Sequence, residues 1–245
     1  MMPRALLYFC CTLVLFAPTL AQEKKKPSPG PRVVLTIPFG AAPGKSTKLT
    51  IRGKNLDSAS EVKVTGGSAR ILSKGKAGVP DKNPDQVGDT QIVIELKLDA
   101  KTVAASLVVV TPTGATKPHV LRVETATAEQ EPNDGFNAAQ MIALPIVVDG
   151  TISRARDVDV FHLQGKKGQR VFAEVHASRH GSPLDAVLAL YDGKGQLLAS
   201  NDDFTKEHRD ARIEVVLPAD GDYYLSLIDA HDTGGPLHVY RLAIK

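Results

Sequence analysis

Acidic and amide side chains are concentrated in one short segment, Glu-Gln-Glu-Pro-Asn-Asp, which runs from Glu129 to Asp134. Ca²⁺ takes about six to eight oxygen ligands, and carboxylates and amide carbonyls supply them. Pro132 favours an extended conformation for Glu131, and alternate side chains of an extended chain point the same way. Glu131 and Asn133 can therefore face a common ion. The segment predicts part of a calcium site rather than a catalytic one.

A second pair of acids follows at the start of an apolar stretch. Asp157 and Asp159 are two residues apart, so a strand places both on one face. If the acidic segment packs beside this turn, the side-chain oxygens converge. The predicted ligands are Glu131, Asn133, Asp134, Asp157 and Asp159, and the predicted cofactor is Ca²⁺. The alternative is that Asn133 and Asp134 cap a short helical turn over residues 136–143 and that the aspartates form turns.

The residues that usually carry catalysis do not form a recognisable set. Both cysteines, Cys10 and Cys11, lie in an apolar run at the amino terminus. The seven histidines are scattered, without a His-Glu-x-x-His motif, and no serine occurs in Gly-x-Ser-x-Gly. We therefore predict no catalytic residues, no organic cofactor and no enzymatic activity.

The amino terminus has the pattern of a secretory signal peptide. Arg4 precedes an apolar run over residues 5–20, and Thr19-Leu20-Ala21 offers a cleavage site. The run is short and contains Pro18, which disfavours a transmembrane anchor. We expect a signal peptide over residues 1–21, a Lys/Pro-rich linker over 22–31, and no transmembrane segment in the mature chain. The protein is then exported, to the periplasm or outside the cell.

Charge divides the rest of the chain at the acidic segment. Residues 32–128 hold 14 Lys and Arg against 8 Asp and Glu, whereas residues 129–245 hold 12 against 18. This change favours a domain boundary, with one domain over 32–126 and another over 127–245. An acidic second half suits divalent cations and argues against a nucleic-acid partner.

Short stretches with two-residue alternation fill both halves, which predicts an all-β protein. Residues 91–98 show the pattern clearly, because Ile92, Ile94, Leu96 and Leu98 alternate with polar residues. Residues 186–190 are continuously apolar, which predicts a central buried strand. Seven strands in the first half and eight in the second are typical of two tandem β-sandwich domains. The segment 75–89 lacks periodicity and is expected to form a long loop.

Several motifs in the second half occur in a familiar order. They are Glu131-Pro132-Asn133-Asp134, Gly150-Thr151-Ile152, Asp157-Val158-Asp159-Val160-Phe161, Asn201-Asp202-Asp203 and Gly221-Asp222-Tyr223-Tyr224. With them, residues 129–245 resemble the bacterial pre-peptidase C-terminal domain, a jelly-roll-like β-sandwich of exported proteins. Its collagen-binding relatives hold Ca²⁺ with the Glu-Pro-Asn segment and the Asp-x-Asp turn. Nothing about proteolysis follows, because the peptidase is missing.

Residues 32–124 resemble an immunoglobulin-like domain of the IPT/TIG type. The similarity lies in Ile51-Arg52-Gly53-Lys54-Asn55-Leu56 and Val109-Val110-Thr111-Pro112-Thr113-Gly114. Together the patterns predict an exported, non-catalytic binding module that contacts an extracellular or envelope polymer or protein. The alternative is a structural or accessory subunit, or spacer, of a separately encoded secreted enzyme.

Overall fold

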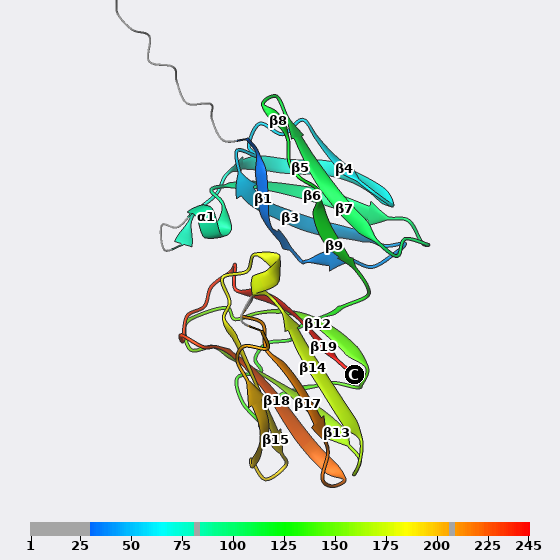
Figure 1. Cartoon of the computed structure of the whole chain (residues 1–245), viewed down its shortest axis with the longest axis vertical. Coiled ribbons are helices and arrows are strands. Elements are labelled where there is room, and N and C mark those ends of the chain that lie inside the picture. Colours follow the sequence, from blue (N-terminus) through cyan, green and yellow to red (C-terminus); the bar gives the residue numbers. More distant parts are fainter. Residues whose placement is uncertain (1–29, 81–83, 206–208) are drawn as a thin grey trace, which may run out of the picture.

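The computed structural model describes residues 30–80, 84–205 and 209–245 (Figure 1). The predicted signal peptide and all but the last two residues of the predicted linker lie outside these ranges. The predicted all-β class is confirmed: strands form four sheets that pack as two sandwiches. The helical elements are short, α1 (Pro84–Val87) and η2 (Ser178–His180). In the described part of the chain, no helix has the length and hydropathy needed to cross a membrane.

The first sandwich contains two mainly antiparallel sheets, ordered β1-β3-β6-β5 and β2-β9-β7-β4, with β8 beside β7. Its strands are β1 (Arg32–Ile37), β2 (Gly40–Ala41), β3 (Ser46–Lys54), β4 (Glu61–Val64), β5 (Gly67–Lys76), β6 (Thr90–Leu98), β7 (Ala105–Thr111), β8 (Gly114–Ala115) and β9 (His119–Val123). On β6 the four alternating apolar residues are fully buried and Glu95 and Lys97 are exposed, as the alternation predicts. These apolar residues fill the core between the sheets.

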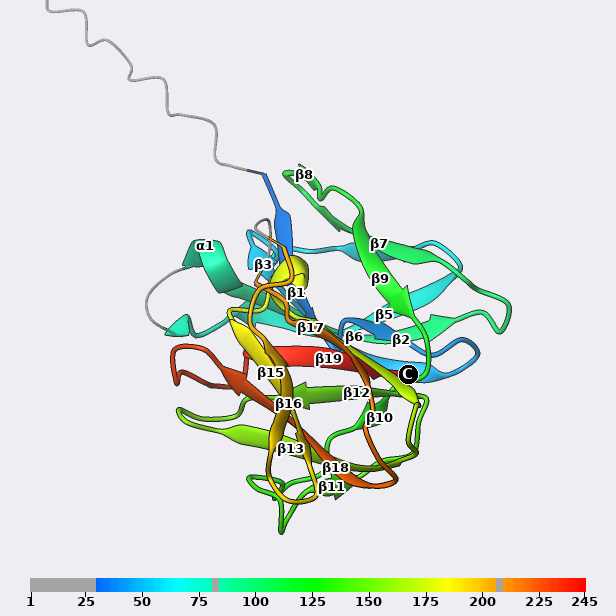
Figure 2. The same ribbon diagram turned by 60° about the horizontal axis from the view of Figure 1, so that its bottom comes forward.

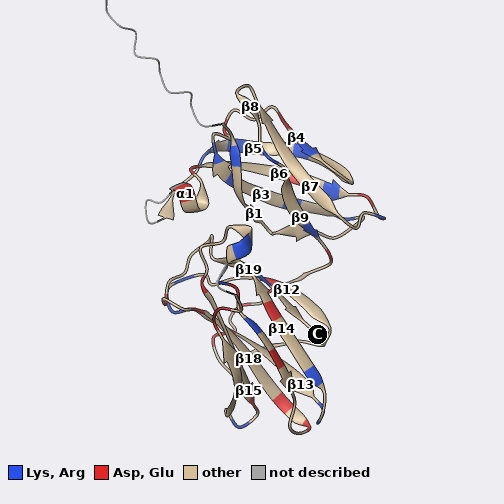
Figure 3. Cartoon of the chain, viewed as in Figure 1, with Lys and Arg blue, Asp and Glu red and all other residues tan. Residues whose placement is uncertain are grey.

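The second sandwich also contains two sheets, ordered β10-β12-β19-β14-β17 and β11-β13-β18-β15-β16. Its strands are β10 (Thr127–Ala128), β11 (Gln140–Met141), β12 (Ile146–Thr151), β13 (Val158–Gly165), β14 (Arg170–His176), β15 (Ala186–Asp192), β16 (Leu197–Asn201), β17 (Arg212–Val216), β18 (Gly221–Asp229) and β19 (Val239–Ile244). The apolar run 186–190 lies in β15, between β18 and β16, as expected for an interior strand. Acidic and basic residues are interspersed over this sandwich in the view of Figure 3.

The acidic segment closes one edge of the second sandwich. Strand β10 pairs in parallel with β12 in one sheet, and β11 pairs in parallel with β13 in the other. The chain between β10 and β11 therefore passes from one sheet to the other. The helix expected over residues 136–143 is wrong: Phe136 to Ala138 form a turn, and β11 follows. Backbone pairing with β13 competes successfully with the weak helical signal of so short a segment.

The two sandwiches contact each other through a small apolar cluster. Leu35, Phe39 and Val87 of the first sandwich pack with Leu237 and Val239 of the second. The segment 75–89, predicted as a loop, takes part in this contact, because α1 contributes Val87 and residue Val79 packs against the same cluster. Figure 2 shows the first sandwich seated over the end of the second where β19 and β12 lie.

A buried arginine joins the interdomain connection to the second sandwich. Arg241 of β19 is 1% exposed and binds both carboxylate oxygens of Asp149, at 2.6 and 2.8 Å. Its third nitrogen donates to Glu124, which lies between β9 and β10, at 3.3 Å. A bidentate Arg–carboxylate pair fixes geometry as well as charge. Arg241 therefore holds Glu124 of the connection against β12 and β19, shortly before the acidic segment begins.

Candidate metal centre

Acidic side chains from the connection and from β13 converge at the closed edge of the second sandwich. Glu129, Glu131 and Asp159 each place a carboxylate oxygen within 4.8 Å of the other two. Two oxygens on opposite sides of one Ca²⁺ are about 4.8 Å apart, since each bond is about 2.4 Å long. The three carboxylates therefore have the spacing that a single calcium ion requires.

Tyr240 and a backbone amide hold the inner part of this cluster. The Tyr240 hydroxyl contacts Glu129 Oε1 at 3.0 Å and Asp159 Oδ2 at 2.7 Å, and its ring is buried. The other Glu129 oxygen accepts a hydrogen bond from the amide of Thr151 at 2.9 Å. Burial, followed by the neighbouring carboxylates, raises the pKa of Tyr240 well above its ordinary value. The hydroxyl therefore keeps its single hydrogen, which lies between the Glu129 and Asp159 carboxylates.

Three buried oxygens of the predicted ligands have no hydrogen-bond donor. They are Asn133 Oδ1, Asp157 Oδ1 and Asp159 Oδ1, and all three residues are nearly or fully buried. Leaving a buried acceptor without a partner costs about 1–3 kcal/mol, so such atoms are rare in native proteins. A hard cation satisfies acceptors without supplying hydrogens. The donor set is therefore one that Ca²⁺ fits.

Asn133 is tied into the cluster by its remaining groups. Its Nδ2 donates to Glu129 Oε1 at 3.1 Å, and its backbone amide donates to Glu131 Oε2 at 3.0 Å. Its carbonyl accepts from the amide of Val160 at 3.0 Å, which attaches the segment to β13. With its amide nitrogen used in this way, the Asn133 side chain presents only its oxygen as a ligand.

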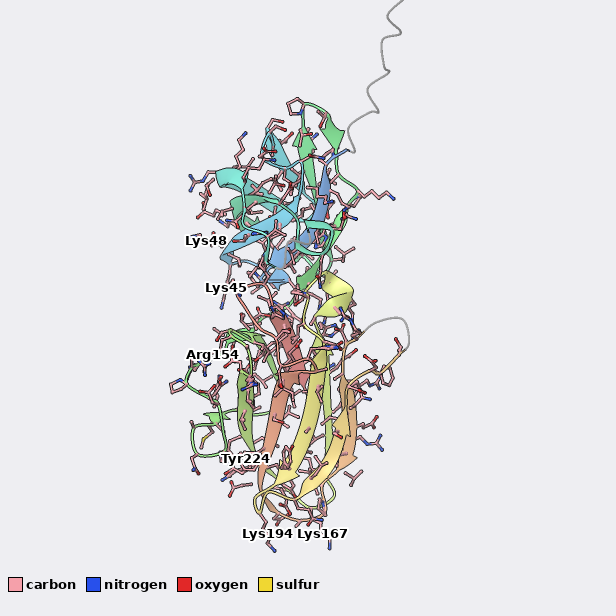
Figure 4. The ribbon with its side chains drawn as sticks, turned by 90° about the vertical axis from the view of Figure 1, so that its left-hand side faces the viewer. Lys45, Lys48, Arg154, Lys167, Lys194 and Tyr224 are labelled. Atoms are coloured by element: carbon pink, nitrogen blue, oxygen red, sulfur yellow. The ribbon has the colours of Figure 1, made fainter. Side chains whose placement is uncertain are left out.

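Asp157 and Asp134 have different surroundings. Asp157 Oδ2 accepts from the amide of Ser153 at 2.5 Å, and Oδ1 lies 3.5 Å from Arg154 without a hydrogen bond. Asp134 is exposed, and both its oxygens bind Arg154 at 2.9 and 3.1 Å. The structure therefore places Asp134 in an ion pair beside the cluster, on the side of the sandwich where Figure 4 shows Arg154.

Crowded carboxylates change the proton affinities of the cluster. Burial, followed by the hydrogen bond and charge of Glu129, raises the pKa of Asp159 to about 10. Burial and the nearby charges of Asp157, Glu129 and Asp134 raise the pKa of Glu131, although the amide of Asn133 opposes the shift. Like charges this close are stable together only with protons or a cation between them.

An aromatic stack attaches the far end of the acidic segment to the sheet. Phe136 stacks on Tyr224 of β18 with centroids 4.4 Å apart, and His162 of β13 stacks on Tyr224 at 5.0 Å. Tyr224, labelled in Figure 4, is half-buried by these two rings. Its neighbour Tyr223 points into the core and is 2% exposed. The stack and Tyr240 thus hold the segment at both ends.

The sequence did not identify Glu129 and Tyr240 as members of the cluster, or Gly150 as the residue that leaves space for them. Glu129 was visible in the acidic segment, but its contact with Tyr240 joins residues 111 positions apart. Gly150 leaves space for these groups: a Cβ there would lie 2.3 Å from the Tyr240 hydroxyl and 2.8 Å from Glu129. The Gly150-Thr151-Ile152 motif at the end of β12 was the available signal for this close packing.

Comparison with known proteins gives one curated relative with significant sequence similarity. A probable subtilase-type serine protease of Deinococcus radiodurans is 39% identical to this chain over 100 residues, which is 40% of the chain. The chain spans only 14% of the length of that protein. No protein-family model matches the chain.

Among solved structures, the chain is similar to the pre-peptidase C-terminal domain of a collagenase from Bacillus anthracis. The match covers 48% of this chain and all of that domain, at 15% identity and a TM-score of 0.37. A structure of CBM51-2 in complex with GlcNAc and INT domains from Clostridium perfringens ZmpB matches over 80% of this chain and 42% of that one, at 13% identity and a TM-score of 0.30.

Proposed function

We infer that this protein is an exported, non-catalytic module whose second sandwich is stabilised by Ca²⁺. It contacts a polymer or protein outside the cell or at the cell envelope. The observation that carries the calcium assignment is the pair of fully buried side-chain oxygens without a partner, Asn133 Oδ1 and Asp159 Oδ1, beside Glu129 and Glu131. Glu129 and Glu131 would hold the ion, together with Asn133, Asp157 and Asp159. The ion would supply positive charge that joins the connection to β13, and no reaction is assigned to it.

The sequence relative supports the accessory character of the module. The matching region is a small part of a protein named as a probable subtilase-type serine protease, and a small shared segment suits an appended domain better than a catalytic one. Within the described residues, the strongest cluster of titratable groups is the acidic one, and it contains no nucleophile with an adjacent base. We therefore assign the site to binding and stability.

Thermal unfolding tests the calcium assignment. Saturation at about 100 times the dissociation constant adds about 2.7 kcal/mol, which raises the melting temperature of a protein of this size by roughly 5–10 °C relative to chelator. Asp159→Asn, which keeps the shape of the neutral acid, should abolish the difference. Asp202→Asn, in the connection after β16, is the matched control and should retain it. Asp134 was predicted as a metal ligand but forms an ion pair with Arg154. The variant Asp134→Asn therefore tests its contribution separately.

The alternative function is that of a structural spacer in a larger secreted assembly. The apolar cluster between the sandwiches favours it, because such a contact fixes their relative orientation. Co-purification and glycan or matrix pull-downs distinguish the two functions. Saturable binding of a polymer supports the binding module, whereas a stable stoichiometric protein partner without polymer binding supports the spacer.

A further inference from the structure

A cavity lies where the two sandwiches meet, away from the acidic cluster. Its volume is about 620 Å³, within the range of roughly 300–1,000 Å³ that is usual for small-molecule sites. Most of its wall is apolar: Ile37, Val79 and Pro80 come from the first sandwich, and Pro236 and Leu237 come from the second. Domain interfaces are common places for ligand sites. The polar residues that line this cavity determine which ligand it could bind.

The polar wall is formed by the outer face of the first sheet. Thr50 and Arg52 alternate with the core residues Leu49 and Ile51 on β3, so both point away from the core. Gln91 of β6 pairs with Arg52 in the strand register and lines the same cavity. The cavity thus combines an apolar body with one cation and two neutral hydrogen-bonding groups.

Arg52 is a buried cation whose protein partners are backbone carbonyls. It is 5% exposed. Its Nε donates to Val87 O at 3.3 Å, and its Nη2 donates to Gly78 O at 2.6 Å and Gly88 O at 2.8 Å. Among the described residues, nothing accepts from Nη1, and no carboxylate forms an ion pair with the guanidinium. The Nη1 end of the Arg52 guanidinium is therefore available to a ligand.

The electrostatics of Arg52 favour an anion. Burial lowers the pKa of the guanidinium, and Asp89 opposes this shift only through its charge at a distance. A buried arginine is usually matched by a carboxylate or phosphate, which its planar fork recognises. The apolar wall opposite favours an anion that carries a hydrocarbon group, because that group gains by burial against it.

We propose that the interdomain cavity is a binding site for a small apolar monocarboxylate. Its carboxylate accepts from Nη1 of Arg52, and its hydrocarbon body packs between Ile37 and Val79 on one side and Leu237 on the other. Thr50 and Gln91 lie beside the carboxylate end. This site is independent of the calcium assignment, because none of its residues belongs to the acidic cluster. A ligand there would contact both sandwiches and hold them together.

Calorimetric titration of the full chain with hexanoate and with hexanamide tests the site. Hexanoate should bind with a dissociation constant on the order of 1 mM, as expected for a ligand of this size. Hexanamide has the same shape without the charge and should bind at least about tenfold more weakly, because a charge-assisted hydrogen bond is lost. Equal affinity for the two probes, or no hexanoate binding, would overturn the proposal.

Two variants separate the cavity from the fold. Gln91→Trp fills the cavity and leaves Arg52 in place, so hexanoate binding should fall at least tenfold. Lys97→Trp, on the same strand and outside the cavity, is the matched control and should bind as the unmodified chain does. Arg52→Gln should remove the preference for hexanoate over hexanamide. If Arg52→Gln does not fold, Gln91→Trp decides, and unchanged binding by that variant contradicts the site.

Two kinds of ligand combine an apolar group with a carboxylate: a small molecule and the carboxyl terminus of a peptide. A peptide probe distinguishes them. A tripeptide that ends in a free leucine carboxylate should bind more weakly than hexanoate, because its polar backbone meets the apolar wall. Tighter binding by the tripeptide would refute the small-molecule assignment and assign the cavity to a chain terminus.

Discussion

Replacement of Gly150 by alanine should disrupt the acidic cluster by displacing Tyr240, which contacts Glu129 and Asp159. The added methyl would lie 2.3 Å from both Cζ and the hydroxyl oxygen of Tyr240, whereas ordinary contacts begin at 3.4 Å. Tyr240 would have to move by about 1 Å, and its two hydrogen bonds to carboxylates would lengthen. Overpacking costs about 1–3 kcal/mol, and weakened hydrogen bonds to charged groups add to it. We expect a loss of about 2–4 kcal/mol.

Thermal and urea unfolding, followed by circular dichroism, measure this loss. A change of this size lowers the melting temperature by roughly 5–15 °C in a protein of this length. Gly135→Ala is the matched control, because a Cβ at Gly135 meets nothing within 4 Å, and it should change stability by less than about 0.5 kcal/mol. If Gly150→Ala melts with the unmodified chain, the described packing of Tyr240 against β12 is wrong.

Two further predictions concern buried charge. Arg241→Met leaves Asp149 without its partner and should cost about 3 kcal/mol by urea unfolding, whereas the exposed Arg170→Met should cost less than about 1 kcal/mol. His176 is 6% exposed, and burial, aided by Arg122, lowers its pKa to about 4. The unfolded chain then binds more protons between pH 6.5 and 4, so stability should fall by up to about 3 kcal/mol as the pH drops through that window. His176→Phe should reduce this slope, and the remainder belongs to the neighbouring His180, whose pKa burial also lowers to about 4. An unchanged slope would contradict the burial of a neutral His176 imidazole.

Much of the fold followed from the two-residue alternation of apolar side chains. It predicted β6, with Ile92 to Leu98 inward, because burial on one face leaves a direct trace in the sequence. The interior strand β15 followed instead from the continuous apolar run over residues 186–190. The short helix after Asp134 was wrong, since a stretch of eight residues contains too little local preference to outweigh pairing with β13. The packing of Val79 and Val87 at the interdomain contact had no periodic signal at all.

The candidate site was predictable only in part, for a related reason. The two-residue spacings of Glu131 with Asn133 and of Asp157 with Asp159 identified groups that could share a face. Whether the groups meet depends on where the connection packs, which local spacing does not encode. The structure brings Glu131 and Asp159 together with Glu129 and ties Asn133 to Glu129, while Asp134 pairs with Arg154, a partner that no spacing rule pointed to.

A calcium titration of the metal-free full chain tests whether the acidic cluster binds a metal ion. We expect one Ca²⁺ to bind per chain in isothermal calorimetry, Asp159→Asn to abolish this binding, and Asp202→Asn to retain it. Binding requires Asp159 because its buried oxygen is one of the three acceptors without a donor. The absence of calcium binding, or binding that is equal in the Asp159→Asn variant, would contradict the assignment of this cluster as a metal centre.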